Sequence, residues 1–522
     1  MGDPSARWFE FVLPGNGRQT LGFLEGERKA FLQLGIRIIG YSIFLVALTF
    51  SWTDEQPSSL HTLLVVFSIL LLGWAAISIA ARSGYVLSTG QWLFAFSLKL
   101  LLTLLLTTWF WVTPLGPHLR DTFGGVQDSN IYDYNGKRLA EVGLTNPNPG
   151  LQSVWLDYGI TRYIAIIYAT FGVSVFYVAL FNALASLGGM LCLLATLVVI
   201  SPQWAVPWQK IRFAMLLPFA SYYDATPAKE APTSLLFYLA VFLCVVVVFG
   251  KRKGFVFKIG LALSCALLAV LRLNVLLLLA CGAFAGLLLA RGALSRRFLV
   301  AAAFVVALLI LVPVAYHLVL PAGDTSLAGM VDEFIGLPRR VQAAQEALGK
   351  KQASANPLVG YVGSIVIPHN VVDFVTLAPL RTLIWLYLPF PFVLPQWKQI
   401  FSLPSLLPND YTEYTAIAET LCAKLSSIVM IVATPGVFAL YRKRAHRLEP
   451  EMVFLIILFF VTALVISNMQ VFETRRYRVL LEPLFLALSM RGYAGGEPRR
   501  HARWIWPMFF VPAVVAYVAT GS

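Results

Sequence analysis

The chain has 522 residues, of which 58% are hydrophobic and only 13% are charged, and its mean hydropathy is +0.74. This composition excludes an ordinary soluble globular protein and indicates an integral membrane protein. The formal net charge is +14. Lysine and arginine gather in short loops between apolar segments, so the excess indicates cytoplasmic anchors and no nucleic-acid partner.

Apolar runs of about 17 to 25 residues recur along the chain, the length that a helix needs to cross a hydrocarbon core about 30 Å thick. We therefore predict an all-α fold, a polytopic transmembrane helical bundle of about thirteen spans with short interfacial helices in its outer loops. The predicted spans cover residues 33–51, 61–81, 92–113, 173–200, 204–222, 232–249, 255–271, 273–290, 298–320, 418–441, 451–469, 478–491 and 503–520.

Basic loops orient these spans. The short segments 251–253, 296–297 and 442–444 hold only lysine and arginine, which are enriched in cytoplasmic loops. With these segments inside, the N-terminus is cytoplasmic. The predicted outer loops then cover residues 114–172, 223–231, 321–417 and 470–477.

Four segments follow from this topology. Residues 1–91 form the cytoplasmic N-terminus and two accessory spans, and residues 92–320 form a transmembrane core that includes the first outer loop. Residues 321–417 form an outer, partly interfacial segment, because prolines at 389, 391 and 395 break a continuous span. Residues 418–522 form the C-terminal spans. The five cysteines have no paired spacing, so neither a disulfide framework nor a metal site is predicted.

The first outer loop carries acids in a chain that is otherwise poor in charge. Asp121, Asp128 and Asp133 are near enough in sequence for at least one to act as a general base at the membrane surface. Tyr132 supplies a stacking face or a hydroxyl donor, and in a helix it shares a face with Asp128 at i and i+4. The alternative is that these acids are ordinary solvated loop residues.

Glu230 is a second acid, at the predicted outer mouth between two spans. In one interpretation it completes an acid and base pair or positions a sugar hydroxyl. In the other, Lys229 and Glu230 form a structural pair at the start of the next helix, whose positive N-terminal end favours an acid.

Arg272 interrupts two apolar stretches at a predicted outer turn. Its planar guanidinium suits phosphate oxygens, and ionisable groups at membrane depth are costly to keep, so we interpret it as an anion ligand. The alternative is an arginine that reaches to the interface and only marks it.

A group of arginines lies where the last predicted outer loop meets the following span. Arg475, Arg476 and Arg478 lie on the predicted outer side, against the charge bias of the rest of the chain, with Glu482 one helical turn after Arg478. These arginines predict a local anion such as a lipid-linked phosphate or pyrophosphate, with Glu482 holding Arg478 in place. The alternative is bulk anionic lipid or internal pairing.

The order of these features resembles the polytopic glycosyltransferases of the C superfamily, in particular bacterial relatives of protein mannosyltransferases and lipid A aminoarabinose transferases. The resemblance spans roughly residues 92 to 495. It rests on the first-loop pattern from Asp128 to Glu141, the 217–223 segment before Lys229-Glu230, the Arg272 turn, the proline-rich 389–397 segment and the arginines at 475–478 followed by Glu482-Pro483-Leu484.

This resemblance implies an enzyme of the bacterial inner membrane whose active site faces the periplasm. It implies transfer of a sugar from a polyprenyl-phosphate-linked donor to a glycan or glycolipid acceptor, with Asp128 as catalytic base, Glu230 as the second acid, and Arg272, Arg475, Arg476 and Arg478 binding the donor phosphate. Two features depart from the family: Asp128 is followed by Ser129 where an acidic pair is common, and the first loop follows the third span. No cofactor is assigned, and a divalent cation is left open, because one isolated acid is a poor metal site.

Two other functions share parts of this pattern. An O-antigen polymerase or ligase also works on lipid-linked glycans through outer-loop arginines, with a lipid-pyrophosphate donor. A transporter of lipid-linked oligosaccharides needs no catalytic acid. The sequence has no matching halves of the kind that transporters often show.

Overall fold

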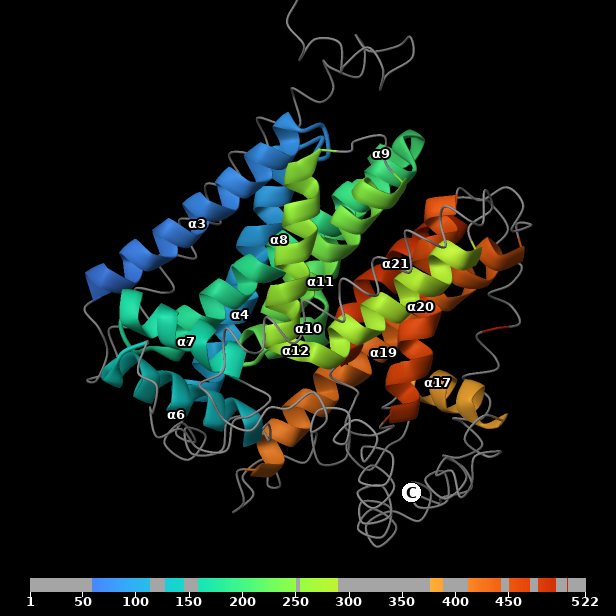
Figure 1. Ribbon diagram of the computed structural model, residues 1–522. Helices are drawn as coiled ribbons and strands as arrows, with labels where there is room; N and C mark the ends of the chain where they lie inside the picture. Colours follow the sequence, from blue (N-terminus) through green and yellow to red (C-terminus); the bar gives the residue numbers. More distant parts are fainter. Residues whose placement is uncertain are drawn as a thin grey trace, which may run out of the picture. The chain divides into compact units, whose positions relative to one another are not determined.

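The structure is a computed structural model that describes residues 59–112, 127–144, 158–249, 254–289, 376–387, 412–442, 450–469, 477–493 and 505. Every regular element in these ranges is a helix (Figure 1). The chain forms two compact units, Met1–Ser264 with Lys398–Cys422 (unit 1) and Cys265–Trp397 with Ala423–Ser522 (unit 2). The all-α prediction is confirmed for the described residues.

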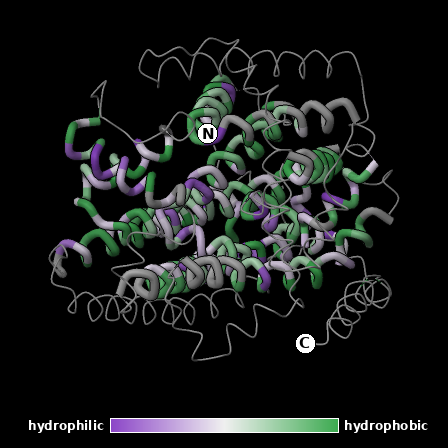
Figure 2. Tube along the Cα trace, turned by 90° about the horizontal axis from the view of Figure 1, so that it is seen from below, coloured by the Kyte–Doolittle hydropathy of each residue, from purple (hydrophilic) through white to green (hydrophobic). Residues whose placement is uncertain are grey.

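Six described helices are long and apolar enough to cross a membrane, which supports a membrane protein. Their apolar stretches are His61–Arg82, Thr89–Thr107, Val175–Ile200, Glu230–Val247, Phe255–Arg272 and Leu421–Leu440. Apolar (green) and near-neutral residues make up most of the helices in Figure 2, and hydrophilic residues come in short groups. The predicted spans 33–51 and 298–320, and nearly all of 503–520, lie outside the described residues.

Unit 1 is built on the long helix α8 (Val175–Ile200), which packs against α3 (Ser59–Arg82), α4 (Thr89–Val112) and α11 (Glu230–Cys244) (Figure 1). Small residues allow α8 and α11 to come close together. A Cβ on Gly188 would lie 2.8 Å from Leu235 Cδ1, and one on Gly189 would lie 3.5 Å from the Leu235 backbone. Small residues at such contacts are typical of membrane helix packing.

The predicted span at 204–222 is wrong as a single helix. The chain there forms short pieces: η2 (Pro202–Trp204), α9 (Ala205–Trp208), η3 (Gln209–Leu216) and α10 (Pro218–Asp224). Prolines at 202, 207 and 218 explain the breaks, because proline lacks a backbone N–H and fits best in a first helical turn.

This broken segment still runs the length of the neighbouring helix. Near its start, the Gln209 side chain accepts a hydrogen bond from Trp92 Nε1 in α4 at 2.9 Å. Just past its end, the backbone oxygen of Ala225 accepts one from Thr107 Oγ1 at 3.2 Å. The stretch of α4 from Trp92 to Thr107 measures about 22 Å at a rise of about 1.5 Å per residue. Irregular backbone at such depth is tolerated where protein buries it.

The predicted first outer loop contains two helices, α6 (Gln127–Val142) and α7 (Tyr158–Phe171), which pack on each other (Figure 1). A Cβ on Gly136 of α6 would lie 2.5 Å from Ile164 Cγ2 of α7, so this contact requires glycine. Gly172 follows α7 with φ 92°, a left-handed conformation that suits glycine at a helix end. The prediction of short helices in this loop is confirmed.

Unit 2 contains the second half of α12 (Phe255–Leu289), α17 (Ala378–Tyr387), most of α19 (Thr412–Arg442), α20 (Pro450–Met469) and α21 (Arg478–Tyr493). Arg272 interrupts α12 with an extended backbone (φ −161°, ψ 85°), at the residue that separates the predicted spans 255–271 and 273–290. The predicted spans 418–441, 451–469 and 478–491 coincide with α19, α20 and α21.

Candidate functional site

The first-loop acids have different positions. Asp121 lies outside the described residues, and Asp128 lies in the first turn of α6, although its side chain is outside the described part. Asp133 is buried and has two side-chain partners. One carboxylate oxygen accepts a hydrogen bond from the Tyr168 hydroxyl of α7, and the other lies 2.6 Å from Lys137 Nζ. The contact with Tyr168 joins α6 to α7, so Asp133 has a structural role.

The Tyr168 phenol is buried in this contact. Burial, together with the neighbouring Asp133 carboxylate, raises the pKa of Tyr168 well above its usual value of 10.0. The phenol therefore stays protonated and remains a donor over the whole neutral range.

Tyr132 brings the first-loop helix to the start of α11. It is buried, and the ammonium group of Lys229 lies 5.4 Å from the centre of its ring. Because residues 127–142 are helical, Asp128 lies one turn before Tyr132 on the same face, as the i and i+4 spacing predicted. Tyr132 therefore connects α6 to Lys229, the residue that directly precedes Glu230.

Glu230 lies in the first turn of α11 and is only 2% exposed. A carboxylate there is stabilised by the positive end of the helix dipole, so the structural interpretation of Glu230 is compatible with its place. Burial beside polar groups is also typical of catalytic acids, so the functional interpretation fits this position too. Both interpretations of Glu230 therefore fit its position.

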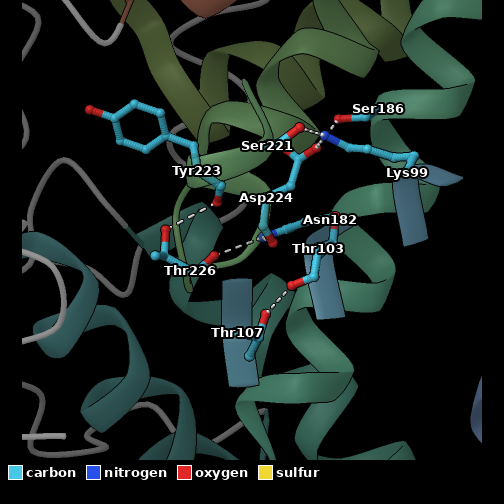
Figure 3. A network of polar contacts seen from close by, with 9 residues as sticks. All are labelled: Lys99, Thr103, Thr107, Asn182, Ser186, Ser221, Tyr223, Asp224 and Thr226. Carbon is cyan, nitrogen blue, oxygen red and sulfur yellow. Dashed lines mark hydrogen bonds and ion pairs between the residues drawn. The ribbon is translucent and has the colours of Figure 1, made fainter. Parts of the chain in front are cut away.

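A buried polar network beside Glu230 was missed by the sequence analysis (Figure 3). Lys99 Nζ, from the middle of α4, lies 2.6 Å from Asp224 Oδ2 at the end of α10 and donates to Ser221 Oγ at 2.9 Å. Ser186 of α8 donates to the same Asp224 oxygen at 2.7 Å. The signal was present, since a lysine inside a predicted span marks a functional or structural site that needs a named partner.

Asn182 of α8 extends this network to the following turn (Figure 3). Its Nδ2 donates to the backbone oxygens of Thr226 at 2.9 Å and of Asp224 at 3.4 Å. Its Oδ1 accepts from the hydroxyl of Tyr163 in α7 at 3.2 Å. Burial, and next the negative charge of Asp224, raise the pKa of the Tyr163 phenol, which keeps it a hydrogen-bond donor.

In unit 2 the break at Arg272 meets the start of α21. The Arg272 guanidinium carbon lies 4.2 Å from the centre of the Tyr477 ring, and Arg272 is buried. Tyr477 directly precedes Arg478. Arg272, a predicted phosphate ligand far from Arg478 in sequence, thus contacts the residue that directly precedes Arg478.

Arg478 is fully buried and held by its own helix. Its Nε and Nη2 donate to Glu482 Oε1 at 3.2 and 2.9 Å, and its Nη1 donates to Ser427 Oγ of α19 at 3.0 Å. The predicted pairing of Glu482 with Arg478 is confirmed. Arg475 and Arg476 lie outside the described residues.

Basic side chains dominate the buried charge of unit 2. Its described residues bury four cationic side chains, Arg272, Arg381, Lys424 and Arg478, and one carboxylate, Glu482. No group of three or more His, Cys, Asp or Glu side chains among the described residues is arranged to hold a metal ion. Comparison with protein-family models, curated proteins and solved structures found no match to the chain.

Proposed function

We propose that this protein is a membrane glycosyltransferase that moves a sugar from a polyprenyl-phosphate donor to a glycan or glycolipid acceptor. The observation that carries the proposal is the contact between Tyr132 and Lys229, because Asp128 precedes Tyr132 by one helical turn and Lys229 directly precedes Glu230. In the proposal, one of these two acids takes the proton of an acceptor hydroxyl and the other helps to position that hydroxyl.

In the proposed reaction the acceptor oxygen attacks C1 of the donor sugar. The new C1–O bond forms as the bond from C1 to the phosphate oxygen breaks, and polyprenyl phosphate leaves with the electron pair. The acceptor proton passes to a carboxylate, Asp128 in the first instance, with Glu230 as the second acid that positions or shares it. A positioned base contributes about a hundredfold to ten-thousandfold to the rate of such a step.

The departing phosphate gains negative charge, and Arg272 and Arg478 are the proposed ligands that stabilise it. Arg272 is stacked on Tyr477, and Arg478 is held in a fixed orientation by Glu482, so neither guanidinium has to reorganise during the reaction. Arg475 and Arg476 are further proposed phosphate ligands. Fixed charges of this kind are usually the largest single contribution to catalysis.

The proposal includes the finer topology: a bundle of about thirteen spans in a bacterial inner membrane, with the acids facing the periplasm. It is supported by the broken segment 202–224, which runs alongside α4 from the level of Trp92 to that of Thr107. That path returns the chain to the end of the bundle where α6 and α7 lie, which the predicted alternation of loops requires.

A second candidate is an O-antigen polymerase or ligase with a lipid-pyrophosphate donor. It is favoured by the excess of buried arginine and lysine over acid in the described part of unit 2, because a pyrophosphate carries more negative charge than a monophosphate. The acid-bearing first loop favours the monophosphate donor, because transfer from that donor needs only one base to take the acceptor proton.

The lipid product separates these candidates. Purified full-length protein in nanodiscs is incubated with polyprenyl-phosphate mannose, glucose, galactose or aminoarabinose and a cell-envelope glycolipid fraction, with Mg²⁺ or with a chelator. Release of polyprenyl phosphate supports the proposal. Activity only with glycans on polyprenyl pyrophosphate, and release of that pyrophosphate, supports the polymerase or ligase and refutes the monophosphate donor.

A further inference from the structure

The turn between α10 and α11 is buried, although the sequence places it in an outer loop. Every residue from Phe219 to Ser234 is buried, including Ala225, Thr226 and Lys229. Connecting segments normally lie on the surface, because a buried turn must find partners for backbone groups that water would otherwise satisfy. The partners of this turn are therefore informative.

Side chains from three other helices hold this turn. Asn182 of α8 donates to the backbone oxygens of Asp224 and Thr226 (Figure 3). Thr107 of α4 donates to the backbone oxygen of Ala225. Three consecutive carbonyl groups are thus bound from outside the turn. Tyr163 of α7 donates to Asn182 and so reaches the turn through it.

The hydrogen-bond partners of Asn182 fix the orientation of its side-chain amide. Two of its partners are carbonyl oxygens, which only accept, so the amide nitrogen must face the turn. The amide oxygen must then face Tyr163, whose hydroxyl donates. An aspartate of the same shape would place an acceptor against two acceptors.

The Lys99–Asp224 pair holds the beginning of the same turn. Asp224 Oδ2 accepts from both Lys99 and Ser186, so the pair connects α4, α8 and α10. Taking two charges out of water is costly, and an apolar pair of similar volume is often as stable or more stable. An ion pair kept in so apolar an interior is therefore better explained by the position it fixes than by the stability it adds.

We propose that Asn182, together with Thr107 and the Lys99–Asp224 pair, is a positioning device that fixes the 225–229 turn and with it the carboxylate of Glu230. Naming Glu230 as a reacting acid rests on the proposed function. The fixing of the turn does not, because it follows from hydrogen bonds within unit 1. None of these positioning residues is assigned contact with the substrate.

The test combines a local structural measurement with kinetics. Asn182→Ala and Asn182→Asp are compared with Thr196→Ala, a control in the same helix whose hydroxyl bonds only to the Cys192 backbone oxygen. Hydrogen exchange of full-length protein in nanodiscs is followed by mass spectrometry for a peptide covering 224–234. Thr107→Val gives a second, milder variant should the Asn182 variants fail to fold.

We expect Asn182→Ala to speed exchange in that peptide about tenfold, the effect of losing roughly one buried hydrogen bond, and Asn182→Asp to speed it more. Exchange in the rest of α8 should stay unchanged, and so should the Thr196→Ala protein. In the transfer assay, kcat should fall at least about tenfold while the KM for the donor stays within about twofold, because only Glu230 is displaced.

Unchanged exchange in the Asn182 and Thr107 variants would overturn the inference whatever their activity. Faster exchange with an unchanged kcat would overturn it too, since the turn would then be held without positioning a reacting group. If the wild-type protein transfers no sugar, the proposed function fails, and the exchange measurement alone still decides whether these residues fix the turn.

Discussion

Lys99 Nζ lies 2.6 Å from Asp224 Oδ2, and the two side chains are 0% and 1% exposed. The pair joins the middle of α4 to the last residue of α10, two elements that are distant in sequence. A charged pair inside a span is expensive to bury and is retained where both partners are present. The broken segment 202–224 therefore has one fixed register along α4.

Removing one partner of this pair should destabilise unit 1 strongly. Lys99→Met leaves a buried carboxylate without its cation, and such losses cost about 3 to 5 kcal/mol. The double variant Lys99→Met with Asp224→Leu should recover most of that loss, because no charge stays buried. Denaturant unfolding in detergent measures both.

Lys137→Met is the matched control, because its ammonium also lies 2.6 Å from an aspartate but its side chain is 37% exposed. It should cost about 1 kcal/mol or less. Equal losses for Lys99→Met and Lys137→Met would contradict the structural role given to the buried pair.

The Tyr168 contact with Asp133 predicts a dependence on alkaline pH. Below pH 10 the phenol is protonated in both the folded and the unfolded chain, and its stabilising contribution is complete. Because the folded pKa lies well above 10.0, only the unfolded chain loses the proton as the pH first rises past 10, and the contribution declines.

The measurement is the difference in melting temperature between wild type and Tyr168→Phe, at about pH 8 and about pH 11. Wild type should be more stable at the lower pH, with a smaller advantage at the higher one. Tyr134→Phe is the control, since Tyr134 directly follows Asp133 on α6 and is exposed. An advantage that grows with pH would show that the folded pKa is not raised.

Gly136→Ala should weaken the contact between α6 and α7. The added methyl group would lie 2.5 Å from Ile164 Cγ2, which belongs to a β-branched side chain that turns away poorly. Alanine favours a helix over glycine by about 1 kcal/mol, but overpacking typically costs about 1 to 3 kcal/mol. Limited proteolysis of the segment 127–171 measures the outcome; slower cleavage in the variant would refute the close packing.

Arg272→Lys should reduce donor binding almost as much as Arg272→Gln, because lysine keeps the charge but loses the planar guanidinium that both stacks on Tyr477 and matches a phosphate. We expect the KM for the donor to rise about tenfold in both, as for one lost charge-assisted hydrogen bond. Tyr477→Phe keeps the ring and should be near wild type, whereas Tyr477→Leu should behave like Arg272→Lys. Full activity of Arg272→Gln would remove it from the donor site.

The sequence predicted the parts of the fold that depend on local pattern. The apolar runs of α8, α11 and α20 are long and uninterrupted, and the break at Arg272 coincides with the one charged residue between two such runs. Residues 204–222 were predicted as a single span because the average hydropathy of the segment hides the prolines that break it.

The site was predictable only where its contacts are local. Arg478 and Glu482 are one helical turn apart, so their pairing follows from spacing. Lys99 with Asp224, Asp133 with Tyr168 and Asn182 with Thr226 are pairs from different elements. Their partners depend on how the helices pack, which spacing along the chain does not reveal.

The central claim concerns an acid in unit 1 and a monophosphate donor, and one assay addresses both. Wild type, Asp128→Asn, Glu230→Gln and Glu141→Gln, the last an exposed acid on α6, are compared in nanodiscs with donor labelled separately in its sugar and its phosphate. The account predicts that wild type and Glu141→Gln release one polyprenyl phosphate for each sugar transferred, and that Asp128→Asn and Glu230→Gln lose at least about a hundredfold in rate with normal expression. Full rates in both of these variants, or sugar transfer without release of polyprenyl phosphate, would contradict it.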